Sequence, residues 1–225
     1  MNDTVINMWY QARLLFSWLH LAIPVALVVA LLLGQGEKAG LSAFQLIRWL
    51  ELLLPLGGIW LAAPLLGHDR DLGLAELQAV RPWGLGYQIV FRYMLVIVYL
   101  ILVAFFLAWA AGGRGRDLSF LLSLIISVLP SLLFFSLFAM MGSLATGSVA
   151  AGFTMAVVLW GGFITYSLLS PSTGLGGWIT PFPGLLGIRG VQALVNRLLY
   201  LAAWVAMDLF CPTLIRSRYA IPNRE

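Results

Sequence analysis

Charged side chains are scarce in this chain of 225 residues. Only 10% of the residues are Asp, Glu, Lys or Arg, whereas 61% are hydrophobic and the mean hydropathy is +0.96. A soluble domain carries about 25% charged residues, so this chain has too few to cover a water-soluble surface. Its apolar runs also lack the strand-type alternation of a membrane β-barrel. The composition predicts an all-α polytopic membrane protein.

Cysteine, histidine and lysine are rarer still. Cys211 is the only cysteine, which excludes an internal disulfide and leaves too few thiols for a zinc or iron–sulfur centre. His20 and His68 are far apart in sequence and predict no metal site. The only lysine, Lys38, lies outside any Gly-x-x-x-x-Gly-Lys-Ser/Thr loop, so nothing in the chain can hold a triphosphate. We expect no cofactor, metal or catalytic residue here. No basic stretch favours nucleic acid, and the net charge of +4 suits lipid headgroups better.

Long apolar runs divide the chain into membrane-crossing segments. A helix needs about 20 mostly apolar residues to cross the hydrocarbon core. Six transmembrane helices are predicted, at 14–33, 44–66, 93–111, 118–141, 148–169 and 194–212. The whole chain, 1–225, is then a single transmembrane domain with both termini on one side. With cytoplasmic termini, seven Lys and Arg residues fall inside and six outside, which barely favours that orientation.

Two further segments are apolar but not suited to crossing lipid as a helix. Residues 1–13 mix charged and aromatic side chains, which predicts an N-terminal interfacial helix; a frayed extension of the first span is the alternative. Residues 170–193 are interrupted by Pro171, Pro181, Pro183 and several glycines. Unpaired backbone is tolerated at membrane depth only where protein or a water-lined cavity covers it. We predict a broken hairpin, interfacial or re-entrant, on the extracytoplasmic side before the sixth span.

Small and aromatic residues indicate how the spans pack. Gly142, Gly152, Gly161 and Gly162 predict close helix contacts, because small residues let backbones approach where lipid gives no hydrophobic drive; a hinge is the alternative. Trp160 lies in the middle of the fifth span, where it could line a cavity or simply pack.

Polar side chains inside the spans are candidates for a transport pathway. Glu51 lies in the second span and Asp208 in the sixth. A carboxylate at the bilayer centre costs at least about 2.5 kcal/mol, so it normally faces protein or water. We assign Glu51, Asp208 and Trp160 to the pathway, with a structural hydrogen bond or an ion pair to Arg48 or Arg197 as the alternative for the carboxylates. Arg197, together with the preceding asparagine, opens the sixth span and is expected to anchor it at the headgroups.

The charge that the chain does have is concentrated between the second and third spans. The segment 67–92 contains Asp69, Arg70, Asp71, Glu76, Arg81 and Arg92. A loop with this much charge lies in water. Leucine, alanine and valine between 72 and 80 can form one apolar face of a short helix, whose N-terminal half is acidic as the helix dipole favours. Pro82 ends it. Such a helix can seat in a groove of a soluble partner.

This loop resembles the first cytoplasmic loop of type 2 ATP-binding-cassette (ABC) exporter permeases. Members of that family carry an acidic residue, then Gly-Thr-x-Glu, a run of leucines and a proline. Gly73, Glu76 and Pro82 match in type and spacing, and Asp69 or Asp71 can stand for the leading acid. The layout of the whole chain, with an interfacial helix, six spans and a broken hairpin before the last, is similar as well.

The sequence departs from the family pattern at two positions. Leu74 replaces the usual threonine, and Gln78 interrupts the leucine run. By resemblance the loop is a cytoplasmic coupling helix that contacts an ATPase subunit and transmits its closure. The residues assigned to this partner contact are Asp69, Arg70, Asp71, Gly73, Glu76, Arg81 and Pro82.

The resemblance implies a permease subunit rather than an enzyme. The partners would be a separate ATPase subunit, which binds Mg-ATP, a second permease copy or paralogue, and membrane lipid. The chain would be a multi-pass protein of the plasma membrane with both termini in the cytoplasm. A haem-exporter-like subunit of cytochrome c maturation has a similar loop and length and stays open. For the loop, the alternative is an ordinary solvated segment. For the whole chain, a structural scaffold and an intramembrane enzyme also stay open, although the sequence has no His-Glu-x-x-His motif and no serine–histidine pair.

Overall fold

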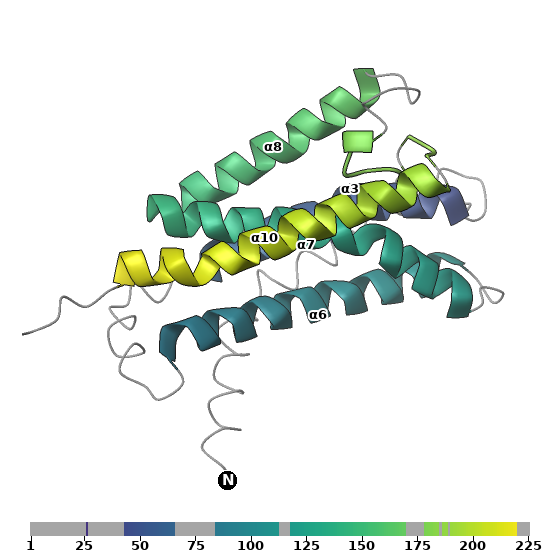
Figure 1. The fold of residues 1–225 in the computed structure, drawn as a ribbon. Helices are drawn as coiled ribbons and strands as arrows, with labels where there is room; N and C mark the ends of the chain where they lie inside the picture. Colours follow the sequence, from purple (N-terminus) through teal and green to yellow (C-terminus); the bar gives the residue numbers. More distant parts are fainter. Residues whose placement is uncertain are drawn as a thin grey trace, which may run out of the picture.

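The computed structural model describes residue 26 and residues 43–65, 84–112, 118–169, 178–184, 186–188 and 190–219. These residues form five long α-helices and no strand (Figure 1). The helices are α3 (Ala43–Ala62), α6 (Gly84–Gly112), α7 (Leu118–Thr146), α8 (Val149–Leu169) and α10 (Val191–Tyr219), with a 3₁₀ turn η1 (Ala63–Leu65) continuing α3. The all-α prediction is confirmed for this part of the chain.

All five helices are long and apolar enough to cross a membrane. Each covers one of the predicted second to sixth spans. The predicted interfacial helix, 1–13, and the first span, 14–33, lie outside the described residues, except that residue 26 is helical. The chain is therefore a helical protein with five candidate membrane-spanning segments, and a sixth stays a prediction.

The helices run alternately up and down the bundle. Trp60 of α3 packs edge-on against Phe153 of α8, with ring centroids 5.5 Å apart. Trp160, two turns further along α8, bonds instead to Leu52, two turns earlier in α3, so these helices are antiparallel. Contacts of α6 with the end of α3 and with the second half of α7 likewise make α6 antiparallel to both.

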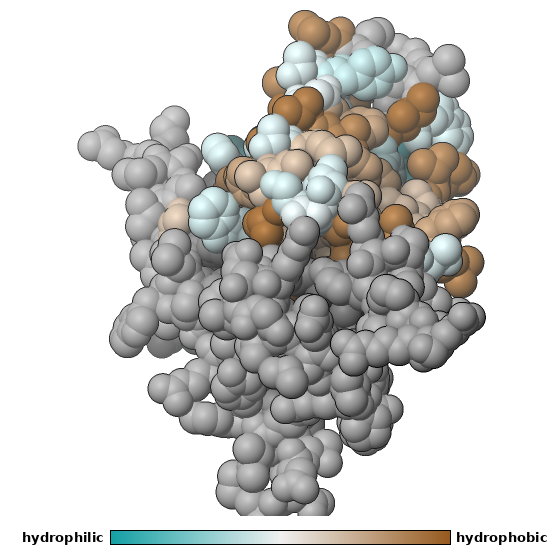
Figure 2. Space-filling view, turned by 90° about the vertical axis from the view of Figure 1, so that its left-hand side faces the viewer, coloured by the Kyte–Doolittle hydropathy of each residue, from teal (hydrophilic) through white to brown (hydrophobic). Residues whose placement is uncertain are grey.

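Helix α7 lies at the centre of the bundle and α8 and α10 lie at its edge (Figure 1). In α7, 67% of the membrane-crossing window is buried inside the chain, against 11% in α8 and 17% in α10. Large apolar side chains are exposed on the two outer helices, among them Val158, Leu168, Leu194, Leu209 and Phe210. Figure 2 shows such hydrophobic side chains reaching the surface at one end of the bundle. Surfaces of this kind suit lipid or another apolar partner.

Glycine makes a close approach between α7 and α8 possible, at two of the four positions where this was predicted. A Cβ added to Gly142 would lie 3.1 Å from the Cα of Gly152, and one added to Gly152 would overlap the backbone of Ser143. In contrast, Gly161 and Gly162 have no described atom within 4 Å of an added Cβ. The packing prediction is confirmed for the first pair and wrong for the second within the described chain.

Several helix ends differ from the predicted spans. Helix α7 continues past residue 141 to Thr146, because Gly147, with φ 68°, supplies the left-handed residue that ends a helix. Helix α6 begins at Gly84, so residues 84–92 of the predicted loop are helical. Arg92 is buried rather than solvated, and its Nη1 donates to Leu65 O at 3.1 Å. That carbonyl ends η1 and has no partner within its own helix, which explains why the arginine is drawn inward.

Candidate functional site

A stretch between α8 and α10 is helical only at its first two residues and packs against the bundle with the rest. We call residues 178–184 the connector. Trp178 and Ile179 are exposed at its beginning, and the five residues from Thr180 to Gly184 are buried. Pro181 and Pro183 lack amide hydrogens and prevent a continuous helix. The predicted segment is therefore broken: Trp178 and Ile179 are helical, residues 180–184 are not, and α10 begins at Val191. The carbonyl groups of this stretch that are buried need partners.

Two of these carbonyls are bonded by side chains of α10. Asn196 Nδ2 donates to Trp178 O at 2.9 Å, and Tyr200 OH donates to Ile179 O. Asn196 and Tyr200 are one turn apart and both are buried. The asparagine is thus buried and bonded to the connector, and its predicted place at the headgroup level stays a prediction.

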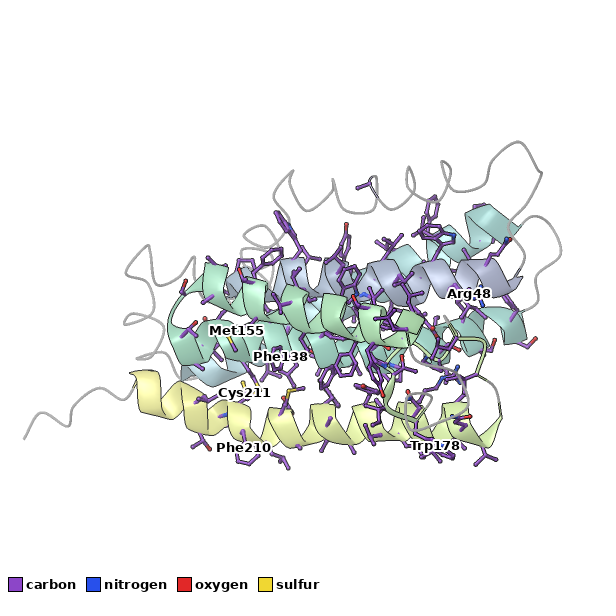
Figure 3. All side chains as sticks on the ribbon, turned by 90° about the horizontal axis from the view of Figure 1, so that it is seen from above. Arg48, Phe138, Met155, Trp178, Phe210 and Cys211 are labelled. Atoms are coloured by element: carbon purple, nitrogen blue, oxygen red, sulfur yellow. The ribbon has the colours of Figure 1, made fainter. Side chains whose placement is uncertain are left out.

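Two further carbonyls are bonded from α7 and α3. Ser131 Oγ donates to Pro181 O, and Arg48 Nε donates to Gly184 O at 3.2 Å. Figure 3 shows Arg48 and Trp178 toward the same end of the bundle, away from Cys211 and Phe210. Donors from three helices thus satisfy the connector backbone, which is the condition for irregular backbone inside a membrane protein.

The connector is also fixed by one aromatic ring and one hydroxyl pair. Phe182 is fully buried and stacks on Phe135 of α7, with centroids 5.8 Å apart and planes 7° apart. Thr180 Oγ1 bonds Ser167 Oγ of α8 at 2.6 Å. All three helices next to the connector, together with α3, therefore hold it in one conformation.

Glu51 faces this connector. Its side chain is 0% exposed, and a Cβ added to Gly184 would lie 2.6 Å from Oε2 and 2.9 Å from Oε1. Only glycine leaves room for the carboxylate at this point. Arg48, one turn earlier on α3, holds the carbonyl of the same glycine. The expectation that this carboxylate faces protein rather than lipid is met, and the surface it faces is the connector.

Trp160 meets α3 beside Glu51. Its Nε1 donates to Leu52 O at 3.2 Å. Pro55 cannot donate to the carbonyl of Glu51, which opens the helix at this turn. The indole N–H bonds the next carbonyl along, so Trp160 braces α3 where its own hydrogen bonding is interrupted. Trp160 thus contacts α3 at the residue that follows Glu51 in the chain.

Asp208 is not part of this group. It is exposed on the second half of α10, one turn from Cys211, which Figure 3 places toward the opposite end from Arg48. An ion pair with Arg197 is wrong too, since eleven residues of helix separate the two by about 16 Å. Arg197 instead donates from Nη2 to Ser127 Oγ at 2.7 Å.

The loop residues assigned to a partner contact lie outside the described residues. They are Asp69, Arg70, Asp71, Gly73, Glu76, Arg81 and Pro82. Their assignment stays a prediction. Within the parts of the chain that the structure describes, no three His, Cys, Asp or Glu side chains come together as metal ligands.

Sequence reasoning missed the polar side chains that hold the connector. Ser131 and Tyr200 are ordinary residues of apolar spans, and nothing local marks them as partners of a loop. One signal was available: Ser123, Ser127 and Ser131 recur every four residues, which places three hydroxyls along one face of α7.

Comparison of the chain with protein-family models, with curated proteins and with solved structures gives no match.

Replacing Trp160 with phenylalanine is expected to lower stability by about 1 kcal/mol, because the ring is kept while the hydrogen bond to Leu52 O is lost. Thermal unfolding in detergent should then shift down by about 2–4 °C. Trp60→Phe is the matched control, since the Trp60 ring packs on Phe153 and is 46% exposed. A control shift as large as that of Trp160→Phe would remove the special role of the indole N–H.

Proposed function

We propose that this chain is the permease subunit of an ABC exporter, driven by a separate ATPase subunit that docks on the loop at 67–83. The observation that carries the proposal is the Gly73, Glu76 and Pro82 pattern between two apolar spans. Five helices long enough to cross a membrane support it. We further propose six spans, cytoplasmic termini, a plasma-membrane location and pairing with a second permease copy or paralogue.

The contacts at both ends of α3 support transmission of a displacement from the loop to the connector. The loop leaves η1 at Leu65 and returns to α6, and Arg92 of α6 is bonded to Leu65 O. The two helices that carry the loop are therefore tied together where it begins. At its other end α3 holds the connector through Arg48 and bears Glu51 against Gly184.

In this proposal, α3 carries motion from the loop to the connector. ATPase closure changes the equilibrium only if the ATPase contacts the loop differently in its two states. A displacement of α3 along its axis would strain the bond from Arg48 to Gly184 and the fit of Glu51 beside it. The connector is then the element that opens or closes the pathway, with Glu51 and Trp160 beside it. Asp208 lies on the second half of α10, away from the connector, and stays a proposed pathway residue there.

Co-purification tests this function. The full chain is expressed in its native cells, extracted in mild detergent and captured by a terminal tag, and the proteins that accompany it are identified by mass spectrometry. The expected companion is a polypeptide with a phosphate-binding loop that hydrolyses ATP. If the purified chain moves cargo across vesicles without any nucleotide-hydrolysing companion, the proposal is overturned.

A further inference from the structure

Arg197 places a positive charge at the edge of the bundle with one neutral partner. Its Nη2 donates to Ser127 Oγ at 2.7 Å, and its Nε is buried without an acceptor. The side chain as a whole is only partly buried, so it can be reached from outside the chain. A guanidinium stays charged at physiological pH and offers five N–H donors. Most of that capacity is unused here.

No carboxylate among the described residues is paired with this arginine. The described residues include two carboxylates, Glu51 and Asp208. Glu51 lies against Gly184, and Asp208 is about 16 Å further along α10. Ser127 adds no negative charge, and its hydroxyl already donates to Ser123 O at 2.8 Å. The partly exposed guanidinium therefore carries a charge that its one neutral partner does not balance, and an anion from outside the described chain would be stabilised beside it.

The surroundings of Arg197 are apolar and open. Ile126 on α7 is 59% exposed, and Leu194 and Leu198 on α10 are each 56% exposed. The membrane-crossing windows of α7 and α10 begin at Leu122 and Val191. Arg197 is thus about 9 Å from the beginning of its window, and a helical side chain leans toward the helix N-terminus, which is the nearer end. The charge therefore lies within reach of the headgroup level.

We propose that Arg197 binds the phosphate of an anionic phospholipid that lies against α7 and α10. Nε is buried, so the donors within reach of a lipid are those of the two Nη groups, which form a planar pair that can match two phosphate oxygens. Ser127 is the positioning residue, because its bond to Nη2 fixes the plane of the guanidinium. The exposed Ile126, Leu194 and Leu198 offer contact to acyl chains, which a free phosphate ion would not use. This site is independent of the proposed transport function.

Native mass spectrometry of the full chain released from nanodiscs tests the site. Nanodiscs of phosphatidylglycerol are compared with nanodiscs of phosphatidylcholine. Retention of phosphatidylglycerol by Arg197→Gln should fall about tenfold relative to the unchanged chain. This is the loss of affinity expected when one charge-assisted hydrogen bond is removed. Arg197→Lys should retain it within about threefold, because the charge is kept and the fork is lost. Arg216→Gln, at the far end of α10, is the matched control and should change nothing.

Unchanged retention of phosphatidylglycerol in Arg197→Gln overturns the proposal. Equal retention of phosphatidylcholine by the unchanged chain does so too, as does full displacement of the lipid by millimolar inorganic phosphate, which would reveal a site for a free anion. If Arg197→Gln is not monodisperse, Ser127→Ala decides. It leaves the charge in place and should lower retention about threefold by freeing the guanidinium, and an unchanged value contradicts the proposal.

Discussion

The proposed function predicts that replacing Glu76 with lysine reduces ATP-dependent transport at least about tenfold while the protein still inserts into the membrane. Glu76 is the acid that matches the family pattern in the loop at 67–83. A charge-assisted hydrogen bond across such a contact contributes about 1.5–3 kcal/mol, and charge reversal adds repulsion to its loss. Because coupling needs the ATPase to distinguish two states of the loop, a weakened contact uncouples hydrolysis from transport.

The measurement compares ATP hydrolysis and cargo movement in the same vesicles. In the Glu76→Lys variant, hydrolysis should continue or fall slightly, whereas transport falls and the ATPase subunit co-purifies in smaller amount. Glu37→Lys is the matched control, since Glu37 lies between the first two predicted spans, 14–33 and 44–66, and so on the opposite side of the membrane from the loop. Unchanged pull-down together with unchanged transport in the Glu76 variant would rule out docking at this residue.

Replacing Gly152 with leucine is expected to cause the largest loss of stability. An added Cβ overlaps Ser143 Oγ and the Ser143 backbone nitrogen, and it lies 2.7 Å from Ala139 O. Backbone cannot move aside as a flexible side chain can. Overpacking of this kind costs about 3 kcal/mol. The backbone of α8 comes close to α7 at this point, so a displacement here would also disturb the side chains that α8 packs between α7 and α3. Thermal unfolding should fall by about 6–12 °C.

Gly161→Leu supplies the control for this prediction on the same helix. No described atom lies within 4 Å of a Cβ at Gly161, so the added side chain meets open space. Its midpoint should stay within about 2 °C of the unchanged chain. Equal losses in both variants would mean that the penalty belongs to leucine in α8, and that the contact with Ser143 does not hold the two helices together.

Hydropathy was enough to predict five of the helices but not where they end. Apolar runs of about 20 residues are long-range averages, and they locate α3, α6, α7, α8 and α10 without any tertiary information. The start of α6 at Gly84 was missed because Arg92 looks like a loop residue. Its burial depends on Leu65 O, a carbonyl 27 residues away. Contacts of that range are invisible to local pattern.

The candidate site, too, was predicted only in part from the sequence. Prolines predicted that the stretch before the last helix would be broken, because proline lacks the donor that a helix needs. The cost of burying a carboxylate predicted that Glu51 would face protein. Neither argument could identify Arg48 as the partner of Gly184, at a separation of 136 residues, or Ser131 as the partner of Pro181. Residue type also could not show that Asp208 and Glu51 lie apart, and their shared assignment to the pathway stays a prediction.

The most direct measurement is photo-crosslinking from position 76 in living cells. A photoreactive amino acid replaces Glu76 in the full chain, and a second chain carries it at Glu37 as the control. Irradiation should join position 76, and not position 37, to a separate cytoplasmic polypeptide that binds ATP, more strongly in one nucleotide state than in the other. Adducts only with lipid, with a protein outside the cytoplasm, or with a partner that has no ATP-binding site would contradict a subunit moved by an ATPase.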